Sequence, residues 1–515
     1  MKYMISSIAL SLIFTAGIAF AKQPAPVRVE QGLLQGTLED GVTVYKGVPY
    51  AAPPVGNLRW RAPRPPAHWK GVRKADKFAA NPVQVMFPTY GPWTSAYMPK
   101  GEVSENCLYL NIWTAAKSPG ERRPVLVYIP GGAFTGGSGD VPVYNGKNLA
   151  KKGLVVVTIN YRVGVFGFLA LPSLTKESKH HSSGNYGLLD QLAALKWVHK
   201  NISAFGGDPS RVTIMGQSAG ALSIMYLTAS PLAKGLFVRA IAESPTDFRN
   251  GLEESLKTGE QYGESFEKAM GVSSLAELRA MPASELLDST NNSYHFLPVL
   301  DGWFLPKKVD EIFRLGEQND VPTIAGWVAN EWSFMGNYGK IPAVEFREQV
   351  RRQAGMLADE ILKLYPASTS AEAAVSQKKF ERDIFLVSMY IWAKERERTG
   401  KTNLYMYLFR HPQPGATEER YETFHSSELP YVFDNLNESD RPWKAEDRNL
   451  ERVMSGYWVN FITTGNPNGK GLPEWPAFKE TPGRIMELGD KMAPRPVMSR
   501  EKLSVLKRVL EDSMR

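Results

Sequence analysis

The feature that most constrains the fold is a serine between two glycines, at residues 216–220, with an apolar run before it and a helix-forming stretch after it. Residues 212–215 have strand character, whereas residues 221–227 favour a helix. A serine in so sharp a strand-to-helix turn has strained backbone angles, and Gly216 and Gly220 let the flanking chains approach each other. Although these five residues are common ones, their setting predicts a nucleophile elbow that exposes the Ser218 hydroxyl. The same turn places the Ala219 amide at a helix start, where unpaired donors attract negative charge.

Apolar runs alternate with helical segments over most of the chain. Runs at residues 110–113, 125–129 and 155–159 precede a helical stretch at 188–205, and later runs lie at 323–327 and 404–409. Continuous apolar strands separated by helices indicate a parallel sheet that is buried on both faces. The first hundred residues instead contain short β-rich runs with turn signals, as in antiparallel strands. We therefore expect an α/β fold with a central, mostly parallel sheet flanked by helices, N-terminal antiparallel strands and helical insertions.

The domain organisation follows from length and composition. The 515 residues are 43% hydrophobic, which allows a large core, and no repeat or low-complexity linker divides them. We expect one catalytic domain over residues 22–515. No pattern in the sequence bears on the oligomeric state.

Residues 1–21 have the pattern of a secretory signal. Lys2 precedes an apolar stretch at 5–20, and small residues at 19 and 21 form an exit site. Serine and threonine interrupt the stretch, which argues against a membrane anchor. We expect cleavage after Ala21 and export to the periplasm or the medium, without stable membrane insertion.

Charge and cysteine content exclude some classes of protein. The net charge of +8 is modest for this length, and the densest charged stretch, at 394–398, alternates in sign, which argues against nucleic-acid binding. Cys107 is the only cysteine in the sequence, so no intramolecular disulfide can form.

A serine nucleophile needs a base and an acid that orients the base. In this kind of sheet both follow the nucleophile in the chain, which leaves His295, His411 and His425 as candidate bases. His411 and His425 both follow the late strand at 404–409. For the acid, Glu331 stands just past the strand at 323–327, although a solvated loop glutamate would look the same. Asp301 is the rival, in a turn where it would cap its own backbone.

A glycine-rich loop follows the strand at 125–129 and contains Gly132 and Ala133. Small residues there let backbone amides face a reacting carbonyl group, as in an oxyanion hole. A phosphate cradle is the alternative, but the Gly-Lys-Ser/Thr of a P-loop does not follow.

Taken together, these residues resemble the type-B carboxylesterase/lipase family of α/β-hydrolases. The resemblance covers nearly all of the mature chain. It implies Ser218 as nucleophile, Glu331 as acid and His425 as base, with oxyanion donors at Gly132, Ala133 and Ala219. It also implies a buried Glu105–Arg162 ion pair, and neither a metal nor a cofactor. The similar blocks lie at residues 45–51, 58–60, 104–111, 160–162, 184–191, 205–209 and 425–431.

The chain departs from the family pattern at several positions. Gln217 replaces the glutamate of cholinesterases, which argues against cholinesterase activity. Val83 stands where many relatives have the disulfide partner of Cys107, so we expect a more mobile loop between them. Trp332 replaces the usual glycine after the acid, and Pro130 replaces an aromatic residue or histidine before the glycine loop.

The sequence therefore predicts a serine carboxylic ester hydrolase that forms an acyl-enzyme. Phe134, Trp327 and Trp332 are candidate substrate-binding residues, and they favour small to medium hydrophobic or aromatic esters as the small-molecule partner. Ordinary core packing is the alternative role for such aromatic residues. Amide or carbonate hydrolysis by the same residues, and a binding protein without activity, are the competing functions.

Overall fold

A computed structural model describes residues 24–245, 253–290 and 294–512 of the chain. The predicted secretory signal, residues 1–21, lies outside the described residues. Within the described ranges, no helix is both long enough and apolar enough to cross a membrane.

An eleven-stranded sheet forms the centre of the described structure. Its strands run parallel from β15 to β8, and only the two ends of the sheet are antiparallel. The predicted mostly parallel α/β sheet with antiparallel N-terminal strands is confirmed. In spatial order the strands are β16 (Ala493–Pro496), β15 (Arg484–Leu488), β14 (Leu404–Phe409), β13 (Thr323–Val328), β10 (Arg239–Glu243), β9 (Gly207–Gln217), β7 (Arg123–Ile129), β8 (Val155–Ile159), β6 (Tyr109–Thr114), β4 (Val42–Pro49) and β3 (Thr37–Glu39).

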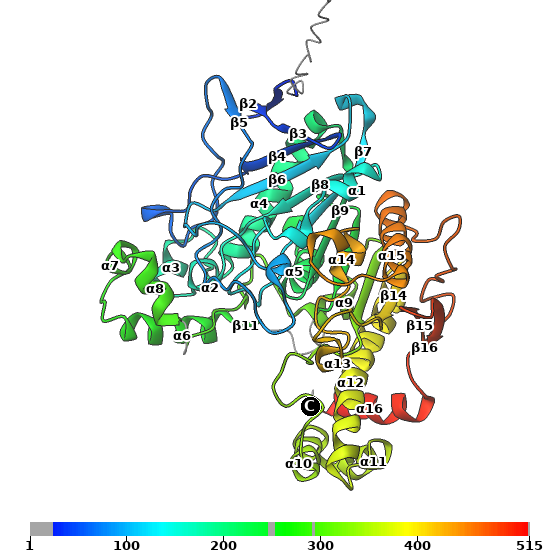
Figure 1. Cartoon of the computed structure of the whole chain (residues 1–515). Helices are drawn as coiled ribbons and strands as arrows, with labels where there is room; N and C mark the ends of the chain where they lie inside the picture. The colour runs from blue at the N-terminus through cyan, green and yellow to red at the C-terminus, as the bar shows by residue number, and fades with distance from the viewer. Residues whose placement is uncertain (1–23, 246–252, 291–293, 513–515) are drawn as a thin grey trace, which may run out of the picture.

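Strand β7 shows why the apolar runs are continuous. Its alternate residues Val125, Val127 and Ile129 pack on one face, in the core that includes helices α4 (Tyr186–Asn201) and α5 (Ala219–Ala229). The intervening Leu126 and Tyr128 pack on the other face, in the core that includes α15 (Ala445–Thr464). Successive strand residues point to opposite faces, so a strand covered by helices on both sides must be apolar throughout. Figure 1 shows these helices around the sheet.

Helical insertions extend the molecule away from the sheet, as expected. The stretch after β10 forms α6 (Leu256–Ala269), α7 (Leu275–Ala280) and α8 (Ala283–Thr290). A second group surrounds its own hydrophobic cluster and projects beyond the sheet in Figure 1. It comprises α10 (Ala343–Ala354), α11 (Ala358–Leu364), part of α12 (Ser370–Thr399) and α16 (Arg500–Asp512).

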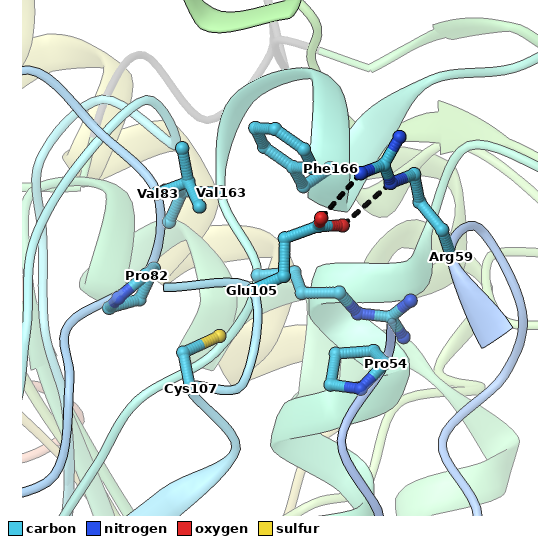
Figure 2. A pocket seen from close by; sticks show the side chains of 9 residues that line it. Pro54, Arg59, Pro82, Val83, Glu105, Cys107, Val163 and Phe166 are labelled. Atoms are coloured by element: carbon cyan, nitrogen blue, oxygen red, sulfur yellow. Dashed lines mark hydrogen bonds and ion pairs between the residues drawn. The ribbon is translucent and has the colours of Figure 1, made fainter. Parts of the chain in front are cut away.

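The buried ion pairs differ from the expected Glu105–Arg162 pair. Arg162 instead pairs with Asp190 of α4, with Nη2 2.8 Å from Oδ1 and Nε 2.8 Å from Oδ2. Glu105 pairs with Arg59, with Oε1 2.5 Å from Nη2. The expectation was wrong because Asp190 engages the guanidinium through both oxygens and also accepts from the Arg162 amide. Figure 2 shows the Arg59–Glu105 pair beside the cavity that Cys107 and Val83 line.

Candidate active site

Four parallel strands, β7, β9, β13 and β14, bring the predicted site residues to one edge of the sheet, with β10 lying between β9 and β13. Ser218 follows β9 directly, and the glycine loop follows β7 directly. Glu331 lies just past β13, and His425 lies on the loop after β14. The carboxyl ends of parallel strands meet at one edge, where ligands bind in sheets of this kind.

The turn at Ser218 has the strained backbone expected of an elbow. Ser218 has φ 60° and ψ −127°, and its amide donates to the carbonyl oxygen of Glu243 at 2.9 Å. A Cβ at Gly216 would lie 2.4 Å from the carbonyl carbon of Gly220, and one at Gly220 would lie 2.1 Å from the Ile129 oxygen. Side chains at these positions would collide with backbone, so both glycines are required by close approach.

His425 and Glu331 meet beside the elbow. His425 Nδ1 lies 2.5 Å from Glu331 Oε2, and the Glu331 side chain is buried with 8% exposed. The other carboxylate oxygen of Glu331 accepts from Ser244 Oγ at 2.6 Å and from the Val328 amide at 3.0 Å. Donors on both oxygens fix the carboxylate, which in turn orients the imidazole.

The second nitrogen of His425 faces the residue before the nucleophile. Gln217 Nε2 lies 3.1 Å from His425 Nε2. With Nδ1 donating to Glu331, Nε2 is the acceptor, so this network assigns the Gln217 amide as its donor. In the described structure no hydrogen bond joins Ser218 Oγ to His425, although the serine is only partly buried beside it. The imidazole must therefore exchange Gln217 for Ser218 before it can act as a base on the serine.

The glycine loop after β7 curls over the elbow. Ala133 has φ 54°, and the Gly132 carbonyl accepts from the amides of Thr135 and Gly136, each at 2.9 Å. A Cβ at Gly131 would lie 3.0 Å from Ser218 Cβ, so the loop contacts the nucleophile directly. Both Gly132 and Ala133 are exposed, and among the described residues their amides donate no backbone hydrogen bond. Together with the Ala219 amide at the start of α5, these donors are free to bind an oxyanion.

The competing histidines and the competing acid have other roles. His411 lies between Asp447 (Nε2–Oδ1 2.9 Å) and Asp490 (Nδ1–Oδ1 2.8 Å). His295 is exposed. Asp301 Oδ1 accepts from the amides of residues 303, 304 and 305, so it caps its own turn as its sequence context suggested. Of the three candidate histidines, the structure brings His425 to the elbow.

Two of the three aromatic residues proposed to bind substrate are buried elsewhere. Phe134 has no exposed surface and packs against Phe168, with ring centroids 5.1 Å apart. Trp327 is 3% exposed, and its indole donates to the Pro245 carbonyl at 2.7 Å. Phe134 and Trp327 are therefore core residues in this structure, and neither ring is exposed to a substrate. Trp332, in contrast, is 39% exposed near the site.

The sequence analysis missed Trp93, which lies against Phe334 beside His425. Trp93 Nε1 donates to Ser426 Oγ at 2.7 Å and to the His425 carbonyl oxygen at 3.1 Å. These hydrogen bonds hold the loop that carries His425 in place. The Phe334 ring lies 5.0 Å from Trp93 and 6.4 Å from His425. No local spacing links Trp93 to His425, since the contact depends on segments far apart in the chain.

The described residues contain no group of three or more His, Cys, Asp or Glu side chains placed to hold a metal ion. A serine at a strained turn, a histidine paired with a buried carboxylate, and free backbone amides are together able to carry out acyl transfer.

Comparisons with known proteins point to the same chemistry. Residues 23–505 match the model of the Carboxylesterase family. The chain is 38% identical over 486 residues to fumonisin B1 esterase of Sphingopyxis macrogoltabida, covering 90% of this chain and 86% of that protein. It is 34% identical over 486 residues to para-nitrobenzyl esterase of Bacillus subtilis, covering 88% and 92%. The crystal structure of carboxylesterase EST55 of Geobacillus stearothermophilus is similar with a TM-score of 0.81 and 33% identity, covering 93% of this chain and 99% of that one.

Proposed function

The chain belongs to the carboxylesterase family and hydrolyses carboxylic esters, and from this premise we propose that Ser218, His425 and Glu331 are its catalytic triad. The observation that carries the proposal is the 2.5 Å contact between His425 and Glu331 beside the strained serine. His425 takes the Ser218 proton, and the serine oxygen attacks the ester carbonyl. The developing oxyanion binds the amides of Gly132, Ala133 and Ala219. The imidazolium then protonates the departing alcohol, and water hydrolyses the acyl-enzyme by the same steps.

The triad is tested by Ser218→Ala. Loss of the nucleophile should lower kcat for a p-nitrophenyl ester by about 10⁴-fold or more, and labelling by a fluorophosphonate probe should disappear. A variant with near wild-type turnover would exclude Ser218. If the wild-type protein neither reacted with the probe nor hydrolysed any ester, an inactive binding protein would be the better description.

We also propose that the alcohol part of the substrate is apolar or aromatic. His425 donates its proton to the oxygen of the leaving alcohol, so this oxygen must lie next to the imidazole and the rest of the alcohol group must extend from there. Beside the imidazole lies Phe334, which continues into a set of partly exposed rings that we call the aromatic strip. The strip comprises Phe334, Trp332 (5.8 Å from Phe334), Trp93 (5.0 Å from Phe334) and Tyr90, which stacks on Trp93 at 5.7 Å.

The aromatic strip is tested by comparing phenyl acetate with ethyl acetate. Phe334→Ala should lower kcat/KM for phenyl acetate about two- to tenfold, because one aromatic contact contributes roughly 0.5–1.5 kcal/mol, and should change ethyl acetate less. Phe78→Ala is the matched control, since this exposed ring packs against Trp113 instead. An equal loss for both esters would contradict an alcohol site on the strip. Faster cleavage of the matching anilide or carbonate would show that an amide or a carbonate is the preferred substrate.

We propose, finally, that the protein is exported after cleavage behind Ala21. The support is the charged start, apolar stretch and small-residue exit of residues 1–21. N-terminal sequencing of the protein recovered from its native host should begin at Lys22. A protein that still begins at Met1 and stays with the cytoplasmic fraction would contradict export.

A further inference from the structure

Two buried glutamates lie behind the proposed triad. Glu243 is the last residue of β10, and Glu428 is the N-cap residue of α14 (Leu429–Val432); both side chains are 0% exposed. Trp458 Nε1 donates to Glu243 Oε1 at 2.9 Å, whereas among the described residues no hydrogen bond of normal geometry reaches the other three carboxyl oxygens, and the Tyr407 hydroxyl is the polar neighbour of Glu428. Burying a carboxylate without a compensating cation is very costly, so such groups retain their proton.

Both glutamates are joined to the triad through short stretches of backbone. The Glu243 carbonyl accepts from the Ser218 amide at 2.9 Å, and the next residue, Ser244, holds Glu331. Glu428 lies on the same loop as His425. The Glu428 carboxyl also interacts electrostatically with the carboxyls of Glu243 and Glu331, so a negative charge on either buried glutamate would act on the acid of the proposed triad.

No cation faces the two carboxyls within the described part of the chain. The neighbouring groups are acidic or neutral and come from several elements: Glu331 after β13, Tyr407 of β14, Tyr128 of β7, Tyr97 of the 3₁₀ turn Ser95–Tyr97, Tyr144 of the 3₁₀ turn Pro142–Tyr144, and Trp458 of α15. Burial raises the pKa of Glu243 to about 8. Burial, together with the charges of Glu243 and Glu331, raises the pKa of Glu428 well above its usual value.

We propose that Glu243 and Glu428 form a protonated acid pair that keeps the space beneath Ser218 and His425 uncharged, and that esterase activity requires this protonation. The inference rests on the proposed triad. In the transition state negative charge develops on the substrate oxygen beside Ser218. An additional buried negative charge would oppose it across a medium of low dielectric constant. The pair touches no substrate and acts through the backbone and the field around Ser218 and His425, so both are positioning residues.

The first test measures unfolding and needs no activity. The pKa of Glu243 is about 8 in the folded protein and 4.5 in an exposed glutamate, so the folded state binds this proton more tightly. Stability from the proton is present below the unfolded pKa and is lost as the pH rises from about 4.5 to about 8. Glu243→Gln has no proton to lose. Its Tm minus that of the wild type should therefore increase from pH 5 to pH 8, whereas exposed Glu254→Gln should show no such trend.

The second test measures kcat against pH. If only the protonated pair supports turnover, a macroscopic pKa near 8 predicts about a tenfold loss of kcat between pH 7 and pH 9 in the wild type. The double variant Glu243→Gln/Glu428→Gln should keep its activity over this range. At pH 6.5 it should lie within about threefold of the wild type, because a neutral amide replaces a neutral acid of the same shape.

Three results would contradict the proposed protonated acid pair. The first is a Tm difference between Glu243→Gln and the wild type that does not change with pH. The others are an alkaline loss of kcat that persists in the double variant, and failure of the single Gln variants to fold. Any of these would show that the native carboxyls are ionised or act only by packing. An inactive wild-type protein would instead refute the proposed triad, and the unfolding test would still decide the protonation of the pair.

Discussion

The hydrogen bond from Ser244 to Glu331 allows a quantitative test of how the acid of the triad is held. Ser244 Oγ donates to Glu331 Oε1 at 2.6 Å, and the serine is 3% exposed. Ser244→Ala removes this donor and leaves the Val328 amide as the other donor to that oxygen. A buried hydrogen bond to a charged group contributes about 1.5–3 kcal/mol. If this energy serves to hold the carboxylate and the imidazole in position in the transition state, its loss should lower kcat/KM about 10- to 100-fold.

The assay is hydrolysis of p-nitrophenyl acetate over a range of pH, together with thermal unfolding. Without the Ser244 donor the Glu331 carboxylate is held by one donor fewer, so the imidazole that it orients should be placed less precisely and kcat/KM should fall throughout the pH range. Ser230→Ala is the matched control, because this fully buried serine donates to the neutral Phe304 carbonyl at 2.7 Å. It should lower Tm and leave kcat/KM unchanged. If Ser244→Ala kept wild-type kcat/KM, or if both variants lost activity equally, the reasoning would be refuted.

Three further changes give distinct results. Gly131→Ala would place its Cβ 2.5 Å from a backbone oxygen of the elbow, so kcat should fall by at least about tenfold even if the variant folds with an unchanged Tm. Asp190→Asn leaves the Arg162 guanidinium buried without its counter-charge and should destabilise the protein by about 3–5 kcal/mol in chemical denaturation. Trp93→Phe keeps an aromatic ring but removes the donor to the His425 loop, so kcat should fall severalfold with little change in KM; a change confined to KM would show that Trp93 only binds substrate.

The strand runs and the elbow were readable from the sequence because their causes are local. A parallel strand buried on both faces must be apolar at every position, and the runs at 125–129 and 155–159 end where β7 and β8 end. The elbow requires small residues on each side of Ser218, since its backbone approaches that of the neighbouring strand. The late strands β15 and β16 were missed, because prolines and charged residues at the sheet edge hide the apolar pattern.

The rest of the site depends on contacts between distant segments. From local sequence, His411 and His425 were equally good candidates for the base. Only the tertiary structure shows that His411 is hydrogen-bonded to Asp447 and His425 to Glu331. The same holds for the buried ion pairs. Glu105 pairs with Arg59, and Arg162 pairs with Asp190, so the two residues do not pair with each other. Exposure also separates Trp332 from the buried Phe134, although both are aromatic residues close in sequence to proposed catalytic groups.

The sequence by itself determined the α/β class, the strand-to-helix turn at Ser218 and the glycine loop, because each depends on backbone constraints over a few residues. Only the tertiary structure decided which histidine meets which acid, which rings remain exposed and which carboxyls are buried without a cation. These outcomes depend on desolvation and on distances between elements hundreds of residues apart, as in the 2.9 Å contact that joins Trp458 to Glu243 beneath the site.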